Sequence, residues 1–135
     1  MSGTVLADTG PLYAATDPSD DHHERAQGDI RRLNSEGVGV TVAYPTLCEC
    51  YSLVLYKLGA GAAQGWLGEI EGGSFLMNPT PEDFREAAAL IREYRDQALS
   101  MFDAVTAVVG RRLSMPVWTY DHYFDVVRVD VWRNG

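Results

Sequence analysis

The chain has 135 residues, the usual size of one domain, and 46% of them are hydrophobic while 22% are charged. These fractions are those of a globular protein with one core, so we expect a single domain over residues 1–135 and exclude disordered and collagen-like chains. Eleven basic and nineteen acidic residues give a formal charge of −8, which argues against electrostatic binding to long stretches of nucleic acid or to an anionic membrane.

Short β-branched runs alternate with longer helical segments along the whole chain. Strands are expected at residues 4–7, 38–42, 74–77, 117–119 and 126–131. Helices are expected from Pro11 onward, at about 21–34, at 45–58, more weakly at 62–70, from Pro81 onward, and at 100–113. This alternation predicts an α/β fold in which a mainly parallel central sheet is flanked by helices.

No apolar run reaches the 18 or more residues of a membrane-spanning helix, and no basic segment precedes an apolar one at residues 1–7. We therefore expect a cytoplasmic protein without a membrane partner. Cys48 and Cys50 lie two residues apart in an expected helix, so their side chains point in different directions and a disulfide between them is not expected. Both are predicted to be buried and reduced.

Four carboxylates each stand alone in a segment that is otherwise uncharged. They are Asp8 in residues 1–16, Glu49 in 38–56, Asp103 in 97–110 and Asp121 in 113–124. An ionised carboxylate in an apolar segment is costly unless it is paired or binds a metal, and these segments contain no Lys or Arg. The pattern predicts that the four acids share a pocket with a divalent cation, Mg²⁺ or Mn²⁺, which prefers oxygen ligands.

The expected topology allows these acids to meet. Asp8 and Asp121 each follow a strand, and ligands of open α/β sheets bind at the carboxyl ends of strands. Asp103 lies in the first turn of its helix, where the helix dipole favours a negative charge. Glu49 lies one turn into its helix and has a longer side chain. For any one acid, a helix cap or a solvated surface position is the alternative; four such acids together favour a common site.

Four motifs match one known family in order and spacing. They are Val5-Leu6-Ala7-Asp8-Thr9-Gly10-Pro11-Leu12, Glu49 in the third helix, Leu99-Ser100-Met101-Phe102-Asp103-Ala104, and Val117-Trp118-Thr119-Tyr120-Asp121-His122-Tyr123-Phe124. With them, the chain resembles a PIN-domain ribonuclease of the VapC type, the toxin half of a bacterial toxin–antitoxin pair. The resemblance implies a three-layer PIN-like fold and metal-dependent hydrolysis of RNA.

The resemblance also implies roles for individual residues and partners. It gives Asp8, Glu49, Asp103 and Asp121 as the metal-binding acidic quartet, and Thr9 and Thr119 as supporting hydroxyls. Asp125 lies near Asp121, so the identity of the fourth acid stays open. The implied partners are an RNA substrate, a separately encoded antitoxin and a second copy of the chain in a homodimer, with Tyr56 and Trp66 as either contact or core residues.

Other functions are less consistent with the sequence. A haloacid dehalogenase phosphatase needs a second Asp where this chain has Gly10, and a response-regulator receiver needs a lysine after a late strand, whereas Lys57 lies in an expected helix. The pair His22 and His23 is typical of an exposed helix start rather than of a metal site. Two alternatives within the family are kept: a PIN-like scaffold that only binds RNA or protein, and a housekeeping RNA-processing nuclease without an antitoxin.

Overall fold

The computed structural model describes residues 3–133 and contains one sheet of five parallel strands. The strands are β1 Thr4–Ala7, β2 Gly39–Ala43, β3 Phe75–Met77, β4 Val117–Trp118 and β5 Val131–Trp132, in the spatial order β3-β2-β1-β4-β5. Every neighbouring pair is parallel, as in Val5 opposite Val40 and Leu6 opposite Val117. The prediction of a parallel central sheet is therefore confirmed.

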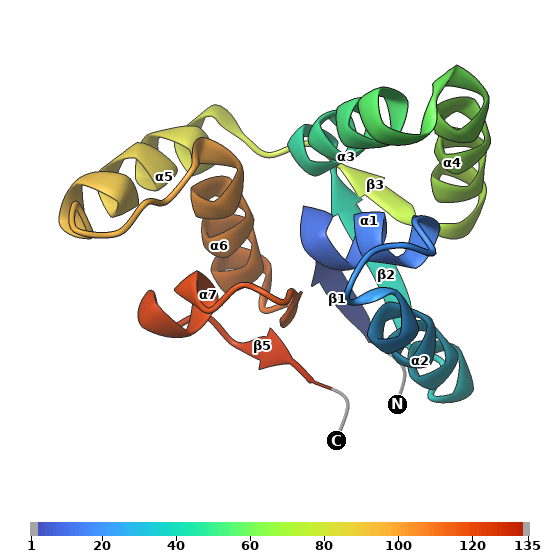
Figure 1. Cartoon of the computed structure of the whole chain (residues 1–135). Helices are drawn as coiled ribbons and strands as arrows, with labels where there is room; N and C mark the ends of the chain where they lie inside the picture. The colour runs from blue at the N-terminus through green and yellow to red at the C-terminus, as the bar shows by residue number, and fades with distance from the viewer. Residues whose placement is uncertain (1–2, 134–135) are drawn as a thin grey trace.

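Helices connect these strands and cover both faces of the sheet (Figure 1). They are α1 Thr9–Thr16, α2 His23–Ser35, α3 Tyr44–Leu58, α4 Ala60–Gly73, α5 Pro81–Glu93, α6 Met101–Leu113 and α7 Tyr123–Val126. Gly59, at φ 96°, separates α3 from α4 in a conformation that residues with a Cβ rarely adopt. Among the described helices, none is both long enough and apolar enough to cross a membrane.

Alternation along β1 divides the core into two clusters. Val5 and Ala7 pack with residues of α1, α2, α3 and α4, whereas Leu6 packs with residues of α5, α6 and α7. All three side chains are at most 1% exposed. This period of two is what a strand buried on both faces requires, and it gives the three layers of the molecule.

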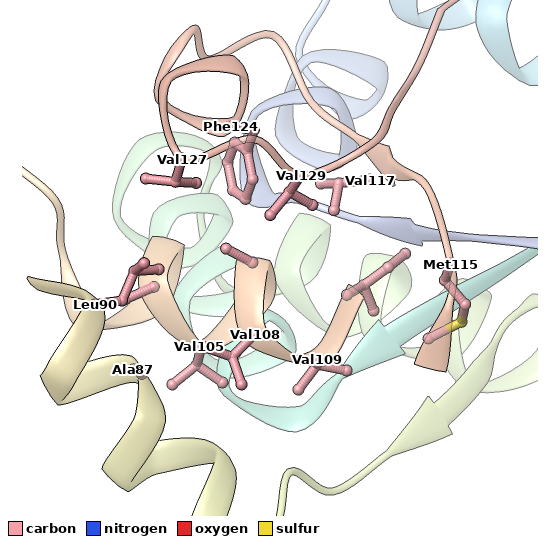
Figure 2. Packing of buried hydrophobic residues seen from close by; sticks show 13 residues of the cluster. Ala87, Leu90, Val105, Val108, Val109, Met115, Val117, Phe124, Val127 and Val129 are labelled. Carbon is pink, nitrogen blue, oxygen red and sulfur yellow. The ribbon is translucent and has the colours of Figure 1, made fainter. Parts of the chain in front are cut away.

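Helix α6 is central to the second cluster. Figure 2 shows Phe124, Val127 and Val129 over one side of α6, while Leu90 of α5 lies on another. Gly110 lets this helix approach β4 closely, because a Cβ at that position would lie 3.0 Å from Val117 Cγ2. The helix carries a carboxylate in its first turn, so its packing fixes part of the candidate site.

Two predictions from the sequence are wrong. Within the expected strand at 126–131, Val126 ends the short helix α7, residues 127–130 form a turn and irregular backbone, and the strand begins only at Val131 and has two residues, Val131–Trp132. Asp121 Oδ1 accepts a hydrogen bond from the Tyr123 backbone N–H at 3.0 Å and so starts a helical turn before the valine-rich run. Cys48 is exposed rather than buried, because it lies on the outer side of α3, while Cys50 is buried in the core.

Candidate active site

The candidate site lies at the carboxyl edge of the sheet, around the end of β1. Asp8 directly follows β1, and its backbone N–H donates to the Trp118 carbonyl at the end of β4 at 2.9 Å. The chain places β2 and β3 on one side of β1 and β4 and β5 on the other. A reversal of strand order of this kind opens a crevice at the carboxyl ends of the central strands, which is where open α/β sheets bind their ligands.

One cavity of about 410 Å³ at this edge contains all four isolated carboxylates. Its lining consists of Asp8, Thr9, Gly10, Glu49, Ser100, Asp103, Tyr120, Asp121 and His122. The acids come from four separate parts of the chain: the end of β1, helix α3, the start of α6 and the loop after β4. None of the described residues in this lining is Lys or Arg, so the structure brings the four acids together without a cationic side chain between them.

Two threonine hydroxyls hold the carboxylates in place. Thr119 donates to Asp8 Oδ2 at 2.8 Å, and Thr9 donates to Glu49 Oε1 at 2.5 Å. The Thr119 hydroxyl oxygen also accepts the backbone N–H of Asp121 at 3.0 Å. These contacts orient the carboxylates and link the loop after β4 to the end of β1.

Asp103 is positioned by the start of α6. Ser100 is the N-cap of that helix, and its hydroxyl accepts the Asp103 backbone N–H at 3.0 Å. A carboxylate in the first helical turn also lies at the positive end of the helix dipole. The helix start therefore fixes Asp103 and favours its negative charge at the cavity.

The carboxylates influence one another electrostatically. Burial, together with the charges of Asp103 and Glu49, raises the pKa of Asp8 to about 7 against the opposing effect of the Thr119 hydrogen bond. Burial likewise raises the pKa of Asp103, with additional contributions from Asp121 and Glu49. Like charges on partly buried, neighbouring carboxylates disfavour full ionisation, so a bound cation would stabilise this site.

The chemistry of these ligands fits a hard divalent cation. Carboxylate and hydroxyl oxygens are the ligands that Mg²⁺ and Mn²⁺ prefer, and the mutual repulsion of the acids is what a bound cation would relieve. Among residues 3–133, no three His, Cys, Asp or Glu side chains are grouped closely enough to hold a metal ion as they stand. The acids thus share a cavity without converging on one point.

Asp121 and Asp125 have different surroundings. Asp121 lines the acidic cavity, whereas Asp125 is exposed and accepts from Arg133 Nη2 at 2.6 Å in an ion pair. Asp125 is absent from the described lining of that cavity. The geometry therefore favours Asp121 as the fourth acid.

Three lining residues were missed by the sequence reasoning. Ser100 could have been found, because Ser followed three residues later by Asp is a helix-capping pattern. Tyr120 and His122 flank Asp121 but carry no pattern of their own. Asp29, in the charge-rich helix α2, is not marked by any sequence pattern either; it is 4% exposed and accepts hydrogen bonds from Trp118 and Tyr120.

The other residues singled out in the sequence, Tyr56, Trp66, His22 and His23, lie outside the acidic cavity. Trp66 is buried in the core and Tyr56 is 84% exposed, so only Tyr56 is available for a contact with a partner. His23 Nδ1 lies 2.7 Å from the Ala14 carbonyl oxygen, which ties α2 to α1. His22 packs edge-on against the Tyr120 ring, at a centroid distance of 5.1 Å. The pair His22 and His23 therefore has the structural role that the sequence favoured.

A larger cavity, of about 540 Å³, lies elsewhere, between α1, α2 and α4. Its lining includes Trp66, Ile70 and Trp118, with Glu69 as its one ionisable side chain among the described residues. A single carboxylate among apolar and neutral polar groups offers no pair of ionisable side chains for acid–base chemistry. We therefore assign the candidate chemistry to the smaller, acidic cavity.

This fold is that of a known domain family. Residues 5–130 match the model of the PIN domain family, and the chain belongs to that family. The three-layer PIN-like fold expected from the sequence is confirmed.

Individual relatives agree with this assignment. Over 109 residues, 80% of this chain and 78% of the relative, the sequence is 27% identical to Ribonuclease VapC26 of Mycobacterium tuberculosis. The fold is similar to that of VapC20 from Mycobacterium tuberculosis, described as a toxin that cleaves the sarcin-ricin loop, with a TM-score of 0.83, 19% identity and coverage of 96% and 99% of the two chains. It is also similar to VapBC2 from Rickettsia felis, solved on a DNA fragment from its promoter, with a TM-score of 0.74, 12% identity and coverage of 99% and 98%. The resemblance to VapC-type proteins is thereby confirmed.

Proposed function

We propose that the chain is a divalent-metal-dependent endoribonuclease and the toxin component of a toxin–antitoxin pair. The observation that carries the proposal is the single cavity lined by Asp8, Glu49, Asp103 and Asp121 at the carboxyl edge of a PIN sheet. The similarity to Ribonuclease VapC26 supports RNA as the substrate class. The similarity to complexes of VapC-type proteins supports an antitoxin partner.

In this proposal the acidic quartet binds the cation and the threonines orient the quartet. Asp8, Glu49, Asp103 and Asp121 supply carboxylate oxygens, while the Thr119 and Thr9 hydroxyls hold Asp8 and Glu49 in their observed orientations. Bound Mg²⁺ or Mn²⁺ supplies Lewis-acid chemistry, which lowers the pKa of a water molecule and stabilises negative charge on phosphate. No side chain is required to form a covalent intermediate with the RNA.

Single isosteric substitutions test the nuclease assignment. We expect Asp8→Asn, Glu49→Gln and Asp103→Asn each to abolish cleavage of cellular RNA with an unchanged circular dichroism spectrum, because each removes one anionic ligand. Asp125→Asn is the matched control, since Asp125 is an exposed acid outside the described lining of the cavity. Full activity in any of the three variants, or undiminished cleavage in EDTA, would contradict the proposal.

We further propose that the chain forms a homodimer and binds a separately encoded antitoxin. A hollow of about 350 Å³ beside the acidic cavity is lined by Leu53, Tyr56 and Phe102 together with Glu49, and these apolar side chains suit a protein contact. Sedimentation at micromolar concentration and capture of partners from the native host test this part. A monomer that recovers no small protein would remove the toxin assignment and leave the nuclease assignment standing.

A further inference from the structure

A cationic and aromatic surface borders the acidic cavity on its α2 side. Arg25 of α2 lies over the ring of Tyr120, with its Cζ atom 4.1 Å from the ring centroid. Tyr120 lines the acidic cavity and also a smaller adjoining hollow of about 140 Å³, whose lining includes Arg25. The two hollows share the lining residues Tyr120, Asp121 and His122 and are therefore adjacent. An extended polymer bound in one hollow can continue directly into the other.

The Tyr120 ring has a fixed support. Its hydroxyl donates to Asp29 Oδ2 at 2.6 Å, and the same oxygen accepts from Trp118 Nε1 at 3.0 Å. Asp29 lies one turn after Arg25 on the same helix and is buried. The guanidinium of Arg25 therefore rests on an aromatic ring that is held by a buried hydrogen bond.

Cations next to the acidic cavity are scarce. Arg25 and Arg133 both line the adjoining hollow, but Arg133 is already paired with Asp125 at 2.6 Å. Within the described part of the chain, the guanidinium of Arg25 is in no salt bridge. The apolar hollow on the other side of the acidic cavity, around Tyr56, has no Lys or Arg in its described lining.

A polyanion that places one phosphate at the acidic cavity must also accommodate the phosphates on either side of it. A guanidinium is suited to that task, because it binds phosphate oxygens through paired N–H donors and keeps its charge at any relevant pH. Among the described linings of the acidic cavity and its two neighbouring hollows, only the hollow on the α2 side contains arginine.

We propose that Arg25, supported by Tyr120, binds the RNA phosphate next to the scissile one, so that the RNA leaves the acidic cavity across α2. This inference rests on the proposed nuclease function and adds to it the direction of the substrate. The ligand is the phosphodiester backbone, and no base sequence is read by this contact.

The experiment compares Arg25→Gln with Arg31→Gln. Arg31 is exposed, lies six residues further along α2 on a different face, and gives the same change in net charge. Both substitutions are placed in an Asp8→Asn background, in which the RNA is not cut. Fluorescence anisotropy then measures the binding of a fluorescein-labelled, random-sequence single-stranded RNA over a series of salt concentrations.

We expect Arg25→Gln to weaken binding about three- to tenfold and to lower the slope of log K against log salt by about 0.7, the value for one phosphate contact on a single strand. Arg31→Gln should leave both quantities unchanged. Arg25→Lys should keep the slope, because it keeps the charge, while losing part of the affinity.

Equal slopes for the two Gln variants, or no binding of the probe at low salt, would overturn the inference. So would a change in sedimentation or in antitoxin capture by Arg25→Gln with an unchanged salt slope, since the surface would then be a protein contact. Cleavage of cellular RNA that depends on Asp8 decides the nuclease function separately, so the two proposals fail on different measurements.

Discussion

Replacing Asp8 with Asn should stabilise the metal-free protein at neutral and alkaline pH. Asp8 is 6% exposed, and burial together with the neighbouring Asp103 raises its pKa from 3.8 to about 7. The native carboxyl group therefore resists ionisation, whereas the same group in the unfolded chain ionises freely. Asn removes this cost and keeps an oxygen that can accept the Thr119 hydroxyl.

The sign of the pH dependence follows from proton binding. Between pH 3.8 and about 7 the native state holds a proton on Asp8 that the unfolded state has released, so the free energy of unfolding falls as the pH rises. Below this interval Asp8 is protonated in both states. Above it Asp8 is ionised in both states, and the destabilisation by its buried charge has its full value. The difference between the two pKa values corresponds to an upper limit on the order of 4 kcal/mol, reached above pH 7.

Urea unfolding in EDTA, followed by tryptophan fluorescence, measures this difference. Asp8→Asn should exceed the wild type in unfolding free energy by a few kcal/mol at pH 8, and the gap should shrink steadily as the pH falls to about 4. Asp125→Asn, at an exposed ion pair, serves as the control and should show no such pH-dependent gain. A gap that does not change with pH, or a wild type at least as stable as Asp8→Asn at pH 8, would refute the reasoning.

Two further predictions concern metal binding and the support of the loop after β4. Mn²⁺ should raise the melting temperature of the wild type by mass action, and an equal rise in Asp103→Asn, measured by scanning fluorimetry, would remove Asp103 from the ligand set. Asp29→Leu should lower the free energy of unfolding by about 2 kcal/mol, because it leaves the Trp118 and Tyr120 donors without their shared acceptor. Asp29→Asn should lose less, since its amide oxygen can occupy the same place; equal losses in urea unfolding would contradict this account.

The acidic cavity could be predicted because charge is scarce in the segments that form it. Asp8 and Asp103 are each the only charge in a long apolar stretch, and burial of the stretch forces the carboxylate to the edge of the sheet. The parallel topology then brings the strand ends together. Sequence spacing therefore identifies these side chains, and the expected parallel topology gives their common location.

Features that depend on contacts between distant elements could not be predicted in this way. The valine-rich run at 126–131 has the composition of a strand, but the turn at Asp121 and the positive φ of 62° at Arg128 direct it into the core instead. Asp29 lies among charged residues of α2, so no pattern in the neighbouring sequence distinguishes it from the solvent-exposed charges around it. Its burial arises from Trp118 and Tyr120, about ninety residues away along the chain.

Residues 118–121, from the end of β4 into the loop that follows it, contact both α2 and the acidic cavity. Trp118 and Tyr120 both point to Asp29 on α2, while Thr119 between them bonds the carboxylate that follows β1, and Asp121 lines the cavity. Successive residues of an extended backbone point to opposite sides, so one short segment can be fixed by the helix layer and still present its oxygens to the acidic edge. RNA that binds against Tyr120 would therefore contact a residue whose position is set by its hydrogen bond to α2. The residues on either side of Tyr120 are Thr119, which orients Asp8, and Asp121, which lines the cavity.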